Sequence, residues 1–128
     1  MGIDRYGSGG SFEPIIGYSR VIRAGDFVEV SGCTGVDADG AIVGGGDPAE
    51  ETRQAIRNIA AALAQAGATV EQVTRTRIFL KDVTMWEAVG RAHGEVFGEI
   101  RPVTTLVEVS SLIDPAMLVE IEASAYLG

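Results

Sequence analysis

The sequence has very few of the residues that disulfide scaffolds and histidine-based metal centres need. Its 128 residues include one cysteine, Cys33, and one histidine, His93. A single cysteine allows no intrachain disulfide and is typical of a protein from a reducing compartment. A single histidine rules out a histidine-based metal site or a histidine pair within one chain. We therefore expect no metal centre.

Positive charge is scarce as well. The chain has 10 lysine and arginine residues against 18 aspartate and glutamate residues, which gives a formal net charge of −8. Non-specific binding to nucleic acids comes from cationic side chains that neutralise phosphates, so an acidic chain is repelled before any contact forms. The charge therefore disfavours a nucleic-acid partner and a nuclease role, and leaves only a local basic patch as an alternative.

Long apolar segments are missing too. No window is long and apolar enough to span a bilayer, and residues 1–10 lack the apolar segment that secretion requires. Tyr6 stands where a myristoylation signal would require serine or threonine. The sequence therefore predicts a soluble, cytoplasmic protein without a membrane partner.

What the sequence does contain is a series of strand and helix patterns that suits one domain. Residues 1–11 are rich in glycine and serine, which predicts a flexible N-terminal segment before a single domain over residues 12–128. Alternating and β-branched residues predict strands, which lie at 18–23, 27–32, 41–43, 73–80, 104–110 and 118–126.

Two helices are predicted between these strands. Residues 47–50 (DPAE) form a strong start signature, apolar residues follow at helical spacing, and Gly67 ends this helix. A capping box begins a second helix over residues 84–97, in which Gly90 and Gly94 suggest close packing against a sheet. The order of elements predicts an α/β fold of the α+β type, a two-layer sandwich in which one mixed sheet carries two helices on one face.

The helices leave the other face of this sheet uncovered. In the last strand Glu120, Glu122 and Ser124 alternate with apolar residues that fit beneath the helices. We expect Thr104 and Leu106, which share one side of the preceding strand, to lie on the same uncovered face. A face that mixes carboxylates with leucine and threonine predicts burial against another subunit.

Several side chains could carry chemistry, and each has a simpler structural interpretation. Glu120 is either a functional carboxylate in an otherwise apolar strand or an ordinary solvated one. Tyr18 offers a phenol at the start of a strand, or packs at the rim of the core. His93 fits a half-buried helix position better than a general base, and Cys33 fits a small buried thiol, since no base or helix N-terminus is evident near it.

Eight short segments follow one another in a characteristic order. They are GY (17–18), VSG (30–32), AIRNI (55–59), AGA (66–68), FLKD (79–82), Pro102, VEV (107–109) and VEIEA (119–123). This order resembles the Rid family (reactive intermediate deaminase, also called YjgF). The resemblance covers nearly the whole chain from about residue 12, and the motifs together are specific, so the chain is identified as a member.

The resemblance implies a chorismate-mutase-like fold assembled as a homotrimer, with clefts between the subunits. Family members with deaminase activity hydrolyse reactive enamines and imines to the keto acid and ammonia without a cofactor, so no cofactor is expected. Their key arginine, in a Pro-x-Arg motif, binds the carboxylate of the substrate. Here Thr104 occupies that position, two residues after Pro102.

The same resemblance implies roles for other positions. Tyr18 and Ser31 match residues of the cleft. Glu120 matches the acid that positions the attacking water, and Leu106 supplies a strand carbonyl.

The cleft also departs from the family pattern. Cys33 stands where glutamine is common, and Gly90 stands where asparagine often occurs. Four arginines could supply a cation that replaces the missing one: Arg20, Arg23, Arg75 and Arg77. Arg77 is the best candidate, although strand arginines are usually at the surface.

Three functions follow from this pattern. The first is a deaminase-like protein that hydrolyses or binds a small reactive metabolite in a cleft between subunits, other than the usual 2-imino acids. The second is a non-catalytic module that binds a small molecule in the same cleft, so enzymatic activity stays open. The third, an endoribonuclease, is disfavoured by the negative charge.

Overall fold

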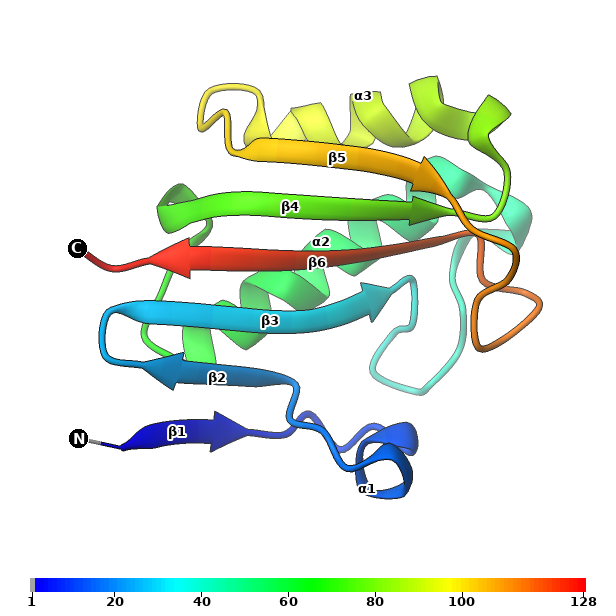
Figure 1. Cartoon of the computed structure of the whole chain (residues 1–128). Helices are drawn as coiled ribbons and strands as arrows, with labels where there is room; N and C mark the ends of the chain where they lie inside the picture. Colours follow the sequence, from blue (N-terminus) through cyan, green and yellow to red (C-terminus); the bar gives the residue numbers. More distant parts are fainter. Residues whose placement is uncertain (1) are drawn as a thin grey trace.

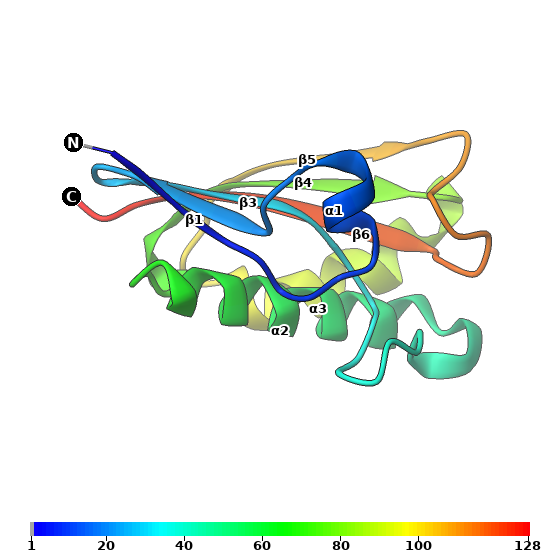
Figure 2. The same ribbon diagram turned by 90° about the horizontal axis from the view of Figure 1, so that it is seen from below.

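The chain folds into two layers, a six-stranded sheet and a pair of helices (Figures 1 and 2). The computed structural model describes residues 2–128. The sheet order is β1-β2-β3-β6-β4-β5, where β4 and β5 are parallel and the other neighbours are antiparallel. The strands are β1 (Ile3–Tyr6), β2 (Val21–Ala24), β3 (Phe27–Thr34), β4 (Val73–Leu80), β5 (Val103–Glu108) and β6 (Val119–Tyr126).

The helices α2 (Pro48–Gln65) and α3 (Trp86–Phe97) lie side by side against one face of the sheet (Figure 2). The prediction of one mixed sheet with two helices on one face is therefore confirmed. Within residues 2–128, no helix combines the length and apolar character needed to cross a membrane.

Helix α2 forms where its start signature predicts it. The carboxylate of Asp47 accepts a hydrogen bond from the backbone N–H of Ala49 at 2.9 Å, and Pro48 occupies the first turn. Its apolar stripe is fully buried at Ile59 and Leu63. Burying this stripe against the sheet is the main source of stability for the helix.

Strand β6 lies at the centre of the sheet between β3 and β4, and its alternation separates the core from the uncovered face. Val119, Ile121, Ala123 and Ala125 are buried in the core beneath the helices. Glu120, Glu122 and Ser124 are only half-buried and lie on the opposite side, as the period of two predicts. We call this opposite side the open face.

The N-terminal segment differs from the prediction. Ile3–Tyr6 form the edge strand β1, which pairs with β2, and α1 (Phe12–Ile16) follows. Glu13 explains why the glycine-rich stretch between them is ordered, because its buried carboxylate accepts hydrogen bonds from the backbone N–H groups of Ser8 and Gly10. The sequence predicts no strand in residues 1–11, whereas residues 3–6 form one; the flexibility of this segment stays a prediction, and Met1 lies outside the described residues.

Three local expectations also need correction. Asp82, and not Thr84, provides the cap: its carboxylate accepts from the backbone N–H of Thr84 at 2.9 Å and begins a 3-10 turn before α3. A Cβ atom at Gly90 or Gly94 would meet nothing within 4 Å, so these glycines are not sites of close packing. The strand predicted at 41–43 is reduced to one bridge between Val36 and Ile42.

Strand β5 is oriented opposite to the prediction: Thr104 and Leu106 face the helix layer and not the open face. Thr104 pairs with the buried Thr76 of β4, and their hydroxyl oxygens are 2.8 Å apart. Leu106 packs against the core. Glu108 also faces the helix layer, because its carboxylate accepts from the backbone N–H of Val83 at 2.9 Å.

The open face of β5 therefore carries Thr105 and Val107, beside Arg77 and Phe79 of β4. A shift of one residue reverses the two sides of a strand. Both sides of this edge strand mix apolar and polar residues, so its hydrophobic pattern does not distinguish them.

Candidate functional site

Glu120 lies on the open face against an irregularity in β3. The pairing of β3 with β6 shifts register between Val30 and Cys33, which is the signature of a β-bulge. A Cβ atom at Gly32 would overlap Oε2 of Glu120 and lie 2.9 Å from its Cγ. The carboxylate therefore occupies the space that the missing side chain of Gly32 leaves.

Arg20 is the cation that acts on Glu120. Its Nη1 donates to the backbone oxygens of Gly32 and, at 3.2 Å, of Ser31, so the guanidinium is fixed on the bulge. Only 14% of its side chain is exposed. Burial raises the pKa of Glu120, while the charge of Arg20 opposes that rise and the charge of Glu122 adds to it. From the sequence, Arg20 is a candidate for this cation but ranks behind Arg77.

Tyr18 lies on the other side of Arg20. Nη2 of Arg20 donates to the phenol oxygen at 3.2 Å, and the guanidinium carbon is 5.4 Å from the centroid of the ring. Glu13 approaches the same nitrogen at 3.7 Å. Because Arg20 donates to the phenol oxygen, the hydroxyl proton of Tyr18 remains available for another acceptor.

Ser31 and Cys33 border this cluster, but their polar atoms face inward. The hydroxyl of Ser31 donates to the backbone oxygen of Arg20 at 3.0 Å. Cys33 is a buried thiol, as predicted, and burial raises its pKa to about 11 although Arg20 opposes the shift. The thiol is therefore protonated near neutral pH and is a poor nucleophile.

Thr104 and Leu106 do not join this cluster within one chain. Glu120 and Thr104 lie on strands separated by β4, in rows three residues apart, and on opposite faces. Strand spacing and rise place them roughly 10 Å apart in each direction. Thr104 instead contacts Thr76, whose hydroxyl is 3.0 Å from Nε2 of the buried His93.

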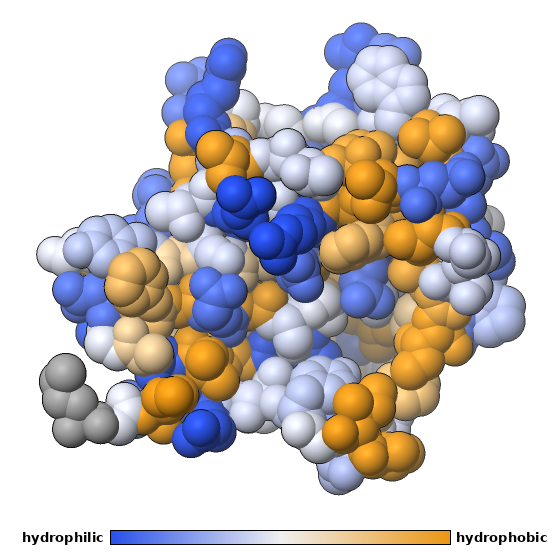
Figure 3. All heavy atoms as spheres, in the orientation of Figure 1, coloured by the Kyte–Doolittle hydropathy of each residue, from blue (hydrophilic) through white to orange (hydrophobic). Residues whose placement is uncertain are grey.

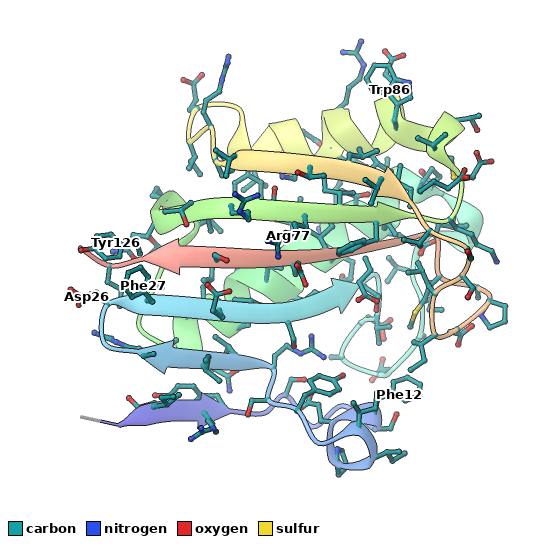
Figure 4. All side chains as sticks on the ribbon, in the orientation of Figure 1. Phe12, Asp26, Phe27, Arg77, Trp86 and Tyr126 are labelled. Atoms are coloured by element: carbon teal, nitrogen blue, oxygen red, sulfur yellow. The ribbon has the colours of Figure 1, made fainter. Side chains whose placement is uncertain are left out.

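Arg77 reaches from β4 over the open face of β6 (Figure 4). Its Nη1 donates to the carboxylate of Glu122 at 2.8 Å, and about half of its side chain is exposed (51%). Arg77 and Glu122, with Arg5, Glu29 and Arg75, line a hollow of about 450 Å³. The cation expected to replace the missing clamp is thus already paired with a carboxylate other than Glu120.

The open face as a whole mixes apolar and charged groups (Figure 3). By strand register it carries five exposed apolar side chains, Ile3 (44%), Phe27 (61%), Val103 (57%), Val107 (41%) and Tyr126 (46%). The rings of Phe27 and Tyr126 contact each other with centroids 5.0 Å apart at one end of the sheet (Figure 4). Exposed apolar groups on this scale mark an interaction surface.

The arginines do not gather into one basic patch. Arg53 contacts Glu50 and Glu95 on the helix side, whereas Arg77 contacts Glu122 on the open face. Arg23 donates to the backbone oxygens of Gly25 and Ala66. Among residues 2–128, no group of three or more histidine, cysteine, aspartate or glutamate side chains could hold a metal ion.

Comparison with known proteins places this geometry in a family. The family model described as endoribonuclease L-PSP matches residues 9–127. An uncharacterised protein of Streptomyces coelicolor is 42% identical over 98% of this chain and 93% of its own length. A protein of Acinetobacter baylyi named 3-aminoacrylate deaminase RutC is 33% identical over 92% of this chain and 93% of its own length.

A crystal structure from Mycobacterium tuberculosis, described as a member of the highly conserved YjgF/YER057c/UK114 family, superposes with a TM-score of 0.89. It is 49% identical in sequence and covers 98% of this chain and 99% of its own. The sequence motifs, the fold and these relatives agree. The chain therefore belongs to the endoribonuclease L-PSP family, which is the Rid or YjgF family.

Proposed function

We propose that the protein hydrolyses a small imine or enamine in a cleft that two copies of the chain complete, within a homotrimer. The observation that carries this proposal is the separation of the two halves of the site. Glu120, Tyr18 and Arg20 cluster on one part of the chain, while Thr104 and Leu106 lie across two strands and on the other face. Both halves can serve one ligand only if they come from different copies.

Glu120 supplies the chemistry of the proposed reaction. Its pKa is raised by burial, and a carboxylate with a raised pKa can accept a proton from water near neutral pH. The water then attacks the carbon of the C=N bond to give a carbinolamine, whose C–N bond breaks to release ammonia and leave the carbonyl product. Tyr18 has a free hydroxyl proton for the nitrogen, because Arg20 occupies only the lone pair of its oxygen.

The proposed substrate lacks the usual carboxylate anchor. Hydrogen bonds to charged groups contribute about 1.5–3 kcal/mol each, and Thr104 offers only a neutral hydroxyl in place of a guanidinium. Arg20 does not replace it, since its Nη1 is committed to backbone oxygens of the bulge. The relative from Acinetobacter baylyi is named for deamination of an enamine, which supports the reaction class without identifying the substrate.

The test compares imines that are generated in situ with and without a carboxylate, and follows their decay. We expect hydrolysis of 2-iminopropionate close to the rate in buffer and faster decay of an uncharged imine. Glu120→Gln should abolish the catalysed decay. Glu29→Gln, a control on the same face whose carboxylate accepts from the hydroxyl of Ser124, should retain it. Equal rates for Glu120→Gln and the unaltered protein would contradict the proposal.

The alternative is a module that binds a small molecule without turnover. The commitment of Arg20 to the backbone favours it, because no free cation faces Glu120 from that cluster. Binding of an uncharged imine analogue without any catalysed decay would support this alternative. A nuclease is less well supported, since the arginines are divided between two faces and several are paired with carboxylates.

A further inference from the structure

Three polar side chains connect the exposed edge of the sheet with the interior beneath α3. The hydroxyl oxygens of Thr104 and Thr76 are 2.8 Å apart, and that of Thr76 is 3.0 Å from Nε2 of His93. Thr76 is fully buried and His93 is 9% exposed, whereas Thr104 is exposed on β5. A surface hydroxyl is therefore linked to a buried imidazole through a single intermediate.

The two hydrogen bonds that join Thr104, Thr76 and His93 can both point toward the surface or both point toward the imidazole. Burial lowers the pKa of His93, so the imidazole is neutral near pH 7 and carries one N–H. When Nε2 holds that proton, it donates to Thr76, and Thr76 donates to Thr104. The hydroxyl of Thr104 then donates to the backbone oxygen of Pro102, 3.4 Å away, or outward to a ligand that replaces this long contact. When Nε2 is bare, Thr76 donates to it, Thr104 donates to Thr76, and Thr104 offers only lone pairs to a ligand.

We propose, building on the cleft described above, that Thr104 recognises an uncharged carbonyl or amide group of the ligand. His93, acting through Thr76, is the positioning residue that sets whether Thr104 donates or accepts. A hydroxyl that can either donate or accept a hydrogen bond matches a neutral group that contains both a C=O and an N–H. The hydroxyl of Thr104 lacks the positive charge that a carboxylate needs for comparable binding.

Pyruvamide and pyruvate are the probes for this proposal, because they have the same shape and differ mainly in charge. Each is titrated into the full-length protein by NMR, with long-range proton–nitrogen spectra of the imidazole. His93 is the single histidine, so these signals belong to one residue. We expect pyruvamide to bind more tightly than pyruvate. Its carbonyl should shift His93 toward the form protonated at Nε2.

Matched variants separate recognition from structure. Thr104→Val should weaken pyruvamide about 5-fold, which corresponds to one neutral hydrogen bond. Thr104→Ser should retain the affinity. Thr105→Val, on the opposite face of the same strand, should leave it unchanged.

The role of His93 has its own readout. His93→Phe keeps a ring beside Phe97, whose centroid lies 4.6 Å from the imidazole, and removes both nitrogens. It should reduce the preference for pyruvamide over pyruvate to within about twofold. His93→Gln keeps a polar nitrogen and should restore much of that preference.

Three results would overturn the inference: equal effects of Thr104→Val and Thr105→Val, equal affinity for the two probes, or no binding of either probe at millimolar concentration. Because these measurements report binding, they stand apart from turnover. Selective amide binding without imine hydrolysis would contradict the proposed function alone. Hydrolysis that depends on Glu120 but ignores Thr104 would contradict the inference alone.

Discussion

Thr104 is the single residue whose replacement has the clearest expected effect. Thr104→Arg places a guanidinium at the position of the family clamp and should raise the hydrolysis of 2-imino acids. A charged contact of about 2–3 kcal/mol corresponds to roughly 30- to 150-fold in rate. The decay assay measures it, and adding Glu120→Gln should remove the gain. A folded, trimeric Thr104→Arg protein without any gain would favour the binding module.

Gly32 tests how far the position of the Glu120 carboxylate matters. Gly32→Ala should displace this carboxylate, because the new methyl group takes its place, while the backbone at Gly32 is not left-handed. We expect a loss of activity of at least about tenfold, since a shift of about an ångström can cost as much as 100-fold. Gly94→Ala is the control: a Cβ there meets no atom within 4 Å, so helix propensity alone should stabilise it by up to about 1 kcal/mol. Full activity of Gly32→Ala would mean that Glu120 is not the catalytic base.

For single residues, the sequence predicts the chemical character of the site better than the positions of its side chains in space. The exposed side of β6 identifies Glu120 correctly as a half-buried carboxylate on the open face. The sequence does not favour Arg20 over Arg77, because the partners of Arg20 are backbone oxygens on another strand, 11 and 12 residues away. Backbone oxygens belong to every residue, so the sequence of side chains does not indicate which of them will bind an arginine. A cation close in space to Glu120 is 100 residues from it along the chain.

Among the elements, the first turn of α2 contains an unusual carboxyl group. Glu51 is fully buried; Oε1 accepts from the backbone N–H of Leu118 at 3.0 Å, while Oε2 has no partner within residues 2–128. Burial raises the pKa of this group. The folded state therefore holds the proton more tightly than the unfolded chain, and stability falls as the pH rises above the ordinary value of the carboxyl.

Glu51→Gln removes this ionisation and should stabilise the protein at neutral and higher pH. Chemical unfolding should give an advantage at pH 8 of about 1.4 kcal/mol for each unit by which the fold raises the pKa of Glu51, and little difference at pH 4. Glu50→Gln, in the same turn but only half-buried, is the control and should not give this advantage at pH 8. An advantage that stayed constant from pH 4 to pH 8 would exclude the titration of Glu51 as its cause.

The elements were predictable to different degrees. Strand β4 matches its predicted limits because β-branched and aromatic residues favour a strand along its length, and its buried positions Thr76, Ile78 and Leu80 alternate. Strand β1 lacks that pattern, since it is stabilised by backbone pairing with β2 and by the capture of N–H groups by Glu13. The sequence could not predict which side of β5 faces the helices, because both sides mix apolar and polar residues and only the pairing with β4 sets the register.

For the whole molecule, the open face predicts assembly. Light scattering at micromolar concentration should give three times the mass of the chain, because the exposed apolar side chains of this face need cover. Val107→Glu, which adds a charge to that face, should yield a smaller species. Gly94→Ala on the helix side should remain a trimer. A monomeric mass for the unaltered protein would contradict both the trimer and the shared cleft.

The parallel pairing of β4 with β5 has a consequence for how the molecule opens. β5 has one strand neighbour, and the chain reaches it only by crossing over through α3. It can therefore detach with little disturbance of β3, β6 and β4, and its backbone amides should exchange with deuterium far sooner than those of β6. The proposed half-site at Thr104 then lies on an edge strand that opens more readily than β6, the strand of Glu120. In the proposed cleft, local opening of β5 would admit ligands of somewhat different size, while the Glu120 half stays fixed.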